Sequence, residues 1–233
     1  APEHSGTHIR ENLGLLARSE KRALIWLALR LPPSVNSDHL SALGLAGIAA
    51  AGLFFAAFPV TKWAAVGVIL SLAVNWFGDS LDGTVARVRD QQRPRYGFYI
   101  DHVIDVAGSS MLLAGMAISG LMNPLVALAV LVAYLLVSAE SYLATHAAGV
   151  FRMSFLGFGP TELRLVLAAG AIRAEMTPWA SVGMAEPLRL FDIGGVIAVS
   201  GMLLAFVVAA VRNTRALYLA EPLPDRQNQG RAA

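Results

Sequence analysis

Four aspartates within a stretch of 27 residues are the side chains of this sequence best suited to chemistry. Asp79 and Asp82 lie three residues apart, and Asp101 and Asp105 lie four apart; at these spacings two side chains share one face of a helix. A short connection joins the pairs, so the two faces can oppose each other. Converging carboxylates need a counter-charge, and all-oxygen ligands favour hard cations such as Mg²⁺, Mn²⁺ or Ca²⁺. Four carboxylates can hold two ions about 3.5–4 Å apart, as in phosphoryl-transfer enzymes.

Small side chains and an arginine follow the first aspartate pair. Gly83 and Ala86 lie one turn further on and leave space for a flat base or a pyrophosphate against the helix. Arg87 can pair with phosphate oxygens. Gly97 alone is more typical of a turn, and any one aspartate is as easily a helix cap. The four aspartates together favour a metal site.

The composition indicates what kind of protein positions these residues. Hydrophobic residues make up 56% and charged residues 15% of the chain, with a mean hydropathy of +0.58. A typical soluble domain is roughly 45–50% apolar and roughly 25% charged. A soluble globule and a disordered chain are therefore both excluded. The absence of cysteine excludes disulfides, thiolate zinc sites and cysteine nucleophiles. The class that remains is an all-α, polytopic membrane protein.

Six mostly apolar runs each approach the length of about 20 residues that a membrane-spanning helix needs. They cover residues 39–58, 63–81, 100–121, 124–147, 161–180 and 190–211. Before them, residues 8–30 have the spacing of an amphipathic helix on the membrane surface, and Asn36, Ser37 or Asp38 is expected to cap the first spanning helix. The expected organisation is a cytoplasmic helix with its connector (1–38), a six-helix transmembrane catalytic domain (39–212) and a cytoplasmic polar tail (213–233).

The basic residues predict which side of the membrane the ends of the chain face. With six crossings, fifteen of the eighteen lysines and arginines lie on the side of the termini, which includes the connections 82–100 and 147–164. This bias places both termini and the aspartates in the cytoplasm. We expect an integral protein of a bacterial or archaeal cytoplasmic membrane, without a cleavable signal peptide. The arginines form no basic stripe, so nucleic-acid binding has no support.

The spacing of the residues resembles the signature of the CDP-alcohol phosphotransferase family. The matching pattern is Asp79-x2-Asp82-Gly83-x2-Ala86-Arg87-x9-Gly97-x3-Asp101-x3-Asp105, in which all eight fixed positions are occupied. The resemblance implies an integral membrane transferase of phospholipid biosynthesis, usually a homodimer and dependent on Mg²⁺ or Mn²⁺. Such an enzyme moves a substituted phosphoryl group from a CDP-linked donor to an alcohol acceptor and releases CMP.

The resemblance also implies a role for each matching residue. The expected metal ligands are Asp79, Asp82, Asp101 and, in part, Asp105. The residues expected to shape the CDP site are Asn75, Gly83, Ala86, Arg87 and Gly97. Asp105 is expected to act as the general base that takes the proton from the acceptor hydroxyl. Because a carboxylate beside metal ions is a weaker base, His102 and Glu162 are the next candidates.

Two features bear on the identity of the donor. His102, directly after Asp101, and the run Gly159-Pro160-Thr161-Glu162 both resemble the choline/ethanolamine phosphotransferase branch. In that branch the CDP carries the small headgroup and the acceptor is a diacylglycerol-like lipid. The sequence favours it slightly over CDP-diacylglycerol with a small polar alcohol. The alternative interpretation is structural, since proline and an acidic residue are common in the first turn of a helix.

Further polar residues lie on the same side as the aspartates. His146, Arg152 and Arg164 surround the connection between the fourth and fifth runs, where they either contact the acceptor or headgroup or only add to the positive charge. Glu140, within the fourth run, should face the interior of the bundle. A cation transporter is a remote alternative. In a transporter the acidic residues lie near the bilayer midplane and the fold is built from repeats, whereas here the aspartates lie at one end of the helices and the sequence shows no repeat.

Overall fold

The computed structural model describes residues 17–148, 159–180 and 188–221. Most of these residues are helical, which confirms the all-α class. The helices are α1 (Ala17–Ala28), α2 (Ser37–Ala56), α3 (Ala64–Val88), α4 (Pro94–Ile118), α5 (Pro124–Ala148), α6 (Pro160–Met176) and α7 (Leu190–Ala220). Strands β1 (Trp179–Ala180) and β2 (Leu188–Arg189) form a two-residue antiparallel pair between α6 and α7.

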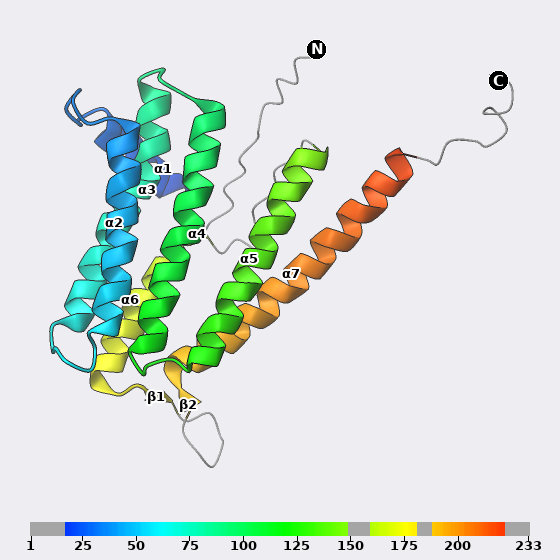
Figure 1. The fold of residues 1–233 in the computed structure, drawn as a ribbon. Helices are drawn as coiled ribbons and strands as arrows, with labels where there is room; N and C mark the ends of the chain where they lie inside the picture. The colour runs from blue at the N-terminus through cyan, green and yellow to red at the C-terminus, as the bar shows by residue number, and fades with distance from the viewer. Residues whose placement is uncertain (1–16, 149–158, 181–187, 222–233) are drawn as a thin grey trace, which may run out of the picture.

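The helices form two groups. In the first, α2 packs against both α3 and α4, while α1 and α6 lie against α3. In the second, α5 and α7 pack on each other, and α5 also contacts α4. Figure 1 shows α5 and α7 leaning away from the first group toward the end where the α3–α4 connection lies. The main apolar core, which includes Phe55, Val68 and Phe191, lies at the opposite end, where α2 to α7 all contribute.

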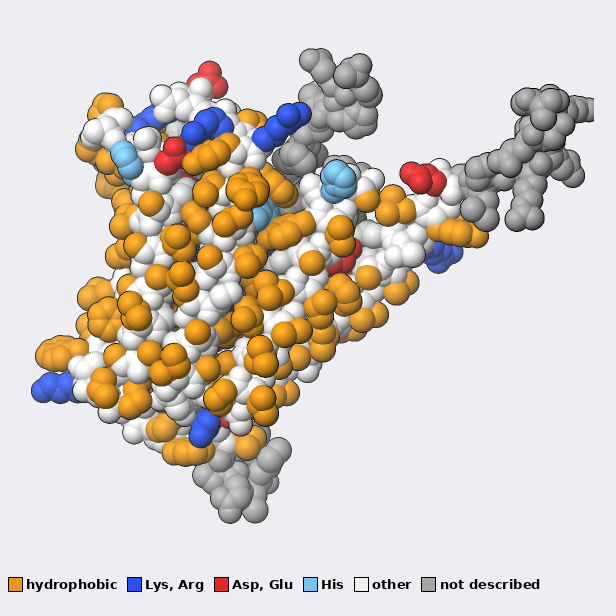
Figure 2. Space-filling model, in the orientation of Figure 1, with side chains coloured by type: hydrophobic (Ala, Val, Ile, Leu, Met, Phe, Trp, Pro, Cys, Tyr) orange, Lys and Arg blue, Asp and Glu red, His pale blue; other side chains and the backbone are white. Residues whose placement is uncertain are grey.

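Five of the described helices are long and apolar enough to cross a membrane: α2, α3, α4, α5 and α7. Large hydrophobic side chains cover their outer surfaces, and charged side chains gather mostly at the two ends (Figure 2). This pattern supports an integral membrane protein. The helix of the fifth predicted run, α6, has 17 residues, so it is shorter than the about 20 that a crossing needs. The sixth crossing therefore stays a prediction.

Polar residues that lie outside the predicted apolar runs continue the helices at two places. The second run ends at residue 81 and the third begins at 100, whereas α3 continues to Val88 and α4 begins at Pro94. Likewise, α7 continues to Ala220, so the beginning of the expected polar tail is helix. Hydropathy marks where a helix leaves the bilayer and not where the helix ends. The α3–α4 connection is therefore only residues 89–93.

Two arginines attach this short connection to the segment before α2. Arg89 donates to the carbonyl oxygens of Val35 at 2.5 Å and Leu31 at 2.9 Å. Arg93 pairs with Asp38 in the first turn of α2. This hydrogen bond raises the pKa of the Arg93 guanidinium above its usual value. The connection is thus held over the start of α2, and this fixes the ends of the helices that carry the aspartates.

Close contact between the α2 and α3 backbones depends on glycine. A Cβ atom at Gly78 would lie 2.4 Å from the amide nitrogen of Gly44, and one at Gly47 would lie 2.5 Å from the amide nitrogen of Asn75. Backbones can approach this closely only where side chains are absent. These glycines surround Asn75 and Asp79 in space, so the packing of α2 sets the position of the aspartate-bearing part of α3.

The N-terminal amphipathic helix predicted for residues 8–30 is described from residue 17 onward, as α1. It buries Leu24 and Ala28 against α2 and α3, whereas Trp26 is 53% exposed. Its position on a membrane surface stays a prediction. The cap of α2 is confirmed as Asn36, whose side chain accepts from the His39 amide at 2.9 Å.

Candidate active site

Three of the predicted metal ligands meet between α3 and α4, both of which pack on α2. Asp79, Asp101 and Asp105 each offer a carboxylate oxygen, and these three oxygens lie within 4.8 Å of one another. All three side chains are partly exposed. The predicted opposition of the two helix faces is therefore present for these residues. An acidic, all-oxygen donor set of this size fits a hard divalent cation such as Mg²⁺ or Mn²⁺.

The fourth predicted ligand, Asp82, lies beside this group and is bound to α2. Its Oδ2 accepts a hydrogen bond from the Ser41 hydroxyl at 2.6 Å, and its Oδ1 accepts from the Gly83 amide at 2.5 Å. The charges of Asp79 and Asp101 still act on its carboxylate. The four-carboxylate cluster expected from the sequence is thus a group of three, with Asp82 next to it and oriented by Ser41.

An arginine from α6 reaches the carboxylate group. Arg164 donates from Nη2 to Asp79 Oδ2 at 2.5 Å and from Nε to Asn75 Oδ1 at 2.7 Å. The side chains of Arg164 and Asp79 are only 15% and 26% exposed, so their ion pair is largely shielded from water. The Nδ2 atom of Asn75 donates to the Gly44 carbonyl at 2.9 Å. Asn75, predicted to contact CDP, therefore joins α2, α3 and α6.

The residues predicted to shape the CDP site extend from the carboxylates toward the end of α3. The atoms nearest to a Cβ atom at Gly83 would belong to the Arg87 guanidinium, the first at 3.2 Å, and Arg87 itself donates to Thr84 Oγ1 at 3.1 Å. Gly97, on α4, is exposed, and a Cβ atom there would meet no described residue within 4 Å. The flexible cationic side chain of Arg87 thus lies over the backbone at Gly83, whereas no described side chain lies over the backbone at Gly97.

A family model described as CDP-alcohol phosphatidyltransferase matches residues 39–211. The chain belongs to this family. The match confirms the resemblance seen in the sequence, and it includes the three clustered aspartates, Asp82 and Arg164. The CDP-alcohol phosphatidyltransferases are transferases of phospholipid synthesis that use divalent metals, which agrees with the all-oxygen group between α3 and α4. A search of curated proteins found no match to the chain.

Two residues that suggested one branch of the CDP-alcohol phosphatidyltransferases have structural contacts. His102 is buried on α4, with Nδ1 at 2.6 Å from the Phe98 carbonyl and its ring 4.8 Å from that of Tyr142. Glu162 accepts from the Gly159 amide at 3.0 Å, so it completes a capping box at the start of α6. The helix-start interpretation of this run therefore accounts for Glu162 without a substrate.

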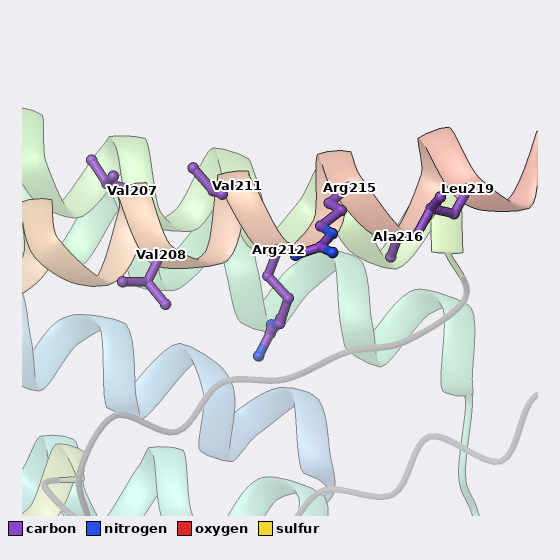
Figure 3. A pocket seen from close by; sticks show the side chains of 7 residues that line it. All are labelled: Val207, Val208, Val211, Arg212, Arg215, Ala216 and Leu219. Atoms are coloured by element: carbon purple, nitrogen blue, oxygen red, sulfur yellow. The ribbon is translucent and has the colours of Figure 1, made fainter.

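The remaining candidates for acceptor contacts differ in what the structure describes of them. His146 is exposed near the end of α5, and Arg152 lies outside the described residues. Glu140 is half-buried and accepts from Asn213 on α7 at 2.6 Å, so it faces the bundle interior as predicted. An open groove of about 530 Å³ runs along α7 and is lined by apolar side chains with Arg212 and Arg215 (Figure 3). None of the predicted site residues that the structure describes lines it.

Sequence reasoning missed Ser41 and Glu20. Ser41 orients Asp82, but it lies in an apolar run where serine is common, so no local signal marked it. Glu20 accepts hydrogen bonds from Trp76 on α3 and Thr161 on α6. The one signal for Glu20 was that it is one of two acidic residues, with Glu11, in a mostly basic amphipathic segment.

Proposed function

We propose that this CDP-alcohol phosphatidyltransferase moves a substituted phosphoryl group from a CDP-linked donor to an alcohol acceptor and releases CMP. The observation that carries the proposal is the group formed by Asp79, Asp101 and Asp105, with their oxygens within 4.8 Å of one another, in a chain of this family. The acceptor oxygen forms a new bond to the phosphorus distal to cytidine. The bond from that phosphorus to the CMP oxygen breaks, and the acceptor proton leaves.

The acidic side chains are proposed to hold Mg²⁺ or Mn²⁺, with two ions bound. Asp79, Asp101 and Asp105 provide the clustered oxygens, and Asp82, oriented by Ser41, adds a carboxylate beside them. The bound ions would supply charge neutralisation for the pyrophosphate and for the departing CMP. Holding several carboxylates in one place is costly without such cations, and this supports the assignment.

The organic part of the donor is proposed to lie along the end of α3 and the start of α4. Gly83 and Ala86 leave room against the helix, and Arg87 at its end can turn from Thr84 to pair with a phosphate. On α4, no described residue would contact a side chain at Gly97 within 4 Å. These residues bind and orient CDP and do not take part in bond making.

Asp105 is proposed to accept the proton of the acceptor hydroxyl. It lies one turn beyond Asp101 on α4 and belongs to the clustered group, so a hydroxyl that reaches the metals also reaches Asp105. A hydroxyl is a weak nucleophile at neutral pH, and a positioned base lowers the barrier to its attack. His102 is a weaker candidate, because its ring is buried against Phe98 and Tyr142.

For the donor, the sequence favours CDP-choline or CDP-ethanolamine with a diacylglycerol acceptor. A specific observation favours the alternative, CDP-diacylglycerol with a small polar alcohol. Arg164 places a guanidinium beside the clustered aspartates, where it suits a charged acceptor such as a sugar or polyol phosphate. We also propose that the enzyme works as a homodimer with its site and both termini on the cytoplasmic side.

The test is release of CMP by purified protein in detergent. Each donor class is supplied with its own acceptors, with and without EDTA. CMP formation that needs a divalent ion and is lost in Asp101→Asn supports the proposal. CMP formation that EDTA leaves unchanged, or no turnover of any CDP-linked donor by folded protein, would contradict it. The donor that gives product distinguishes the two branches.

A further inference from the structure

Glu20 joins three helices through one carboxylate oxygen. Its Oε1 accepts from the indole Nε1 of Trp76 at 2.8 Å and from the Thr161 hydroxyl at 2.8 Å. The three residues lie on α1, α3 and α6, far apart in the sequence. The carboxylate therefore crosslinks an N-terminal helix outside the family match to two helices inside it.

Both hydrogen-bond partners of Glu20 are close in sequence to Arg164 or to a residue that Arg164 bonds. Trp76 directly follows Asn75 on α3, and Thr161 lies three residues before Arg164, in the first turn of α6. Arg164 in turn bonds Asn75 and Asp79. The first turn of α6 is therefore attached to α3 twice, once directly by Arg164 and once through Glu20.

Among the described residues, the buried contacts of α6 lie further along the helix than Thr161 and Arg164. The buried residues of α6 are Ala171 and Ala174, two to three turns beyond Arg164 and in the apolar core. In the first turn of α6, Glu162 accepts from the Gly159 amide, and this hydrogen bond does not join α6 to another helix. The hydrogen bond from Thr161 to Glu20 is thus a specific contact that keeps the first turn of α6, and with it Arg164, against α3.

We propose that Glu20 is a positioning residue that holds Arg164 at Asp79 and so tunes how strongly the carboxylate group binds a divalent cation. The inference rests on the proposed function, because it assumes that Asp79 is a metal ligand. A guanidinium 2.5 Å from Asp79 competes with a cation for the same carboxylate. Loosening Arg164 lowers that competition, and removing Glu20 loosens Arg164.

The experiment is a double-mutant cycle on Mn²⁺ affinity, measured by electron paramagnetic resonance on metal-depleted protein without substrate. Arg164→Gln should tighten Mn²⁺ binding by about fivefold or more, the lower end of typical couplings between two sites. Glu20→Ala should shift the affinity in the same direction but less. In the Arg164→Gln background, Glu20→Ala should have no further effect, because the residue it positions is absent.

Two further variants make the result specific. Glu20→Gln keeps an oxygen acceptor for Trp76 and Thr161 but loses the charge, so its effect should lie between those of the wild type and Glu20→Ala. It also serves as the test if Glu20→Ala does not fold. The matched control is Glu175→Ala, an exposed glutamate near the end of α6, the helix that carries Arg164, which should leave the Mn²⁺ affinity unchanged.

The inference is overturned if Glu20→Ala leaves the affinity unchanged, or if its effect persists in the Arg164→Gln background. It is also overturned if Arg164→Gln has no effect. If wild-type protein and Asp79→Asn both fail to bind Mn²⁺, the proposed metal site fails instead. The positioning by Glu20 is then tested by thermal unfolding, without metal, of the four proteins of the cycle: wild type, Glu20→Ala, Arg164→Gln and the double variant. Non-additive losses of melting temperature support the coupling, and additive losses overturn it.

Discussion

Arg164 on α6 forms an ion pair with Asp79 on α3, with 2.5 Å between Nη2 and Oδ2. The protein therefore supplies a cation of its own to a carboxylate of the proposed metal site. The sequence suggested Arg164 either as a contact for an acceptor or as part of the positive-inside charge, in the least apolar of the six runs. The pair gives α6 a direct link to the carboxylates, although the helix is too short to count among the five spans.

The first prediction separates the clustered carboxylates from Asp82. Asp79→Asn and Asp101→Asn each remove a charge from the clustered oxygens and should abolish both Mn²⁺ binding and detectable turnover. Asp82→Asn should also abolish turnover but weaken Mn²⁺ binding by only about 10–100-fold, as for a residue next to the ligands, because its carboxylate is bound to Ser41. Metal titration together with a CMP-release assay checks this. Near-wild-type activity in any of the three would remove that residue from the site.

The second prediction concerns the orientation of Asp82. Ser41→Ala removes the donor at 2.6 Å, and hydrogen bonds to charged groups are worth roughly 1.5–3 kcal/mol. The free energy of unfolding should fall by about 1–3 kcal/mol and turnover should drop, with a smaller change in Mn²⁺ affinity. Ser110→Ala is the matched control, because the Ser110 hydroxyl donates to the Val106 carbonyl of its own helix. Equal effects of the two variants would show that Ser41 has no special role at Asp82.

The third prediction tests the close packing of α2 on α3. A methyl group at Gly78 would lie 2.4 Å from backbone nitrogen and 2.5 Å from backbone oxygen of α2, so Gly78→Ala must push the helices apart. We expect a loss of roughly 1–3 kcal/mol, the usual cost of overpacking, together with reduced turnover. Gly201→Ala on α7, where a Cβ atom meets none of the described residues within 4 Å, should be neutral or slightly stabilising. Thermal unfolding in detergent compares the two, and equal melting temperatures would argue against the close contact.

Much of the site follows from local spacing, which sequence shows directly. The intervals Asp79–Asp82 and Asp101–Asp105 put each pair on one helix face, and the apolar runs located all the long helices. The grouping of Asp79 with Asp101 and Asp105 was therefore predictable. The ends of the helices could not be predicted in this way. The apolar run ends at residue 81, where the chain leaves the bilayer, whereas α3 continues through Asp82 to Val88.

Contacts between distant segments were out of reach of the sequence. The orientation of Asp82 depends on Ser41, one helix earlier, and the place of Arg164 depends on how α6 packs on α3. Neither contact leaves a periodic signal. The contacts of His102 were out of reach for the same reason. His102 projects about 100° around the helix from Asp101, and its ring packs on that of Phe98.

The fourth prediction is the topology, for which the cysteine-free chain is well suited. Gln92 lies exposed in the α3–α4 connection, and Lys62 lies exposed in the turn between α2 and α3. The positive-inside bias predicts that a cysteine at Gln92 is labelled only from the cytoplasm and one at Lys62 only from outside. Labelling of intact cells by a membrane-impermeant maleimide decides this. Labelling of the Gln92 variant from outside would invert the proposed orientation.

The last prediction addresses Asp105, which is proposed both to contact metal and to accept a proton. If proton transfer is its main role, Asp105→Asn should lower turnover by about two to four orders of magnitude, the usual range for general-base catalysis. Metal and donor affinity should fall much less than in Asp79→Asn. The structure makes this a demanding test, because the Asp105 oxygen lies within 4.8 Å of those of Asp79 and Asp101.

Asp105→Glu provides the control, because it restores a carboxylate but moves it by one methylene. As a base it should recover part of the lost turnover, whereas a displaced ligand should disturb metal binding further. If Asp105→Asn loses Mn²⁺ as completely as Asp79→Asn, Asp105 is primarily a ligand. The base would then be another group, and Glu162, which accepts from the Gly159 amide at the start of α6, would rank ahead of His102, whose ring packs against those of Phe98 and Tyr142.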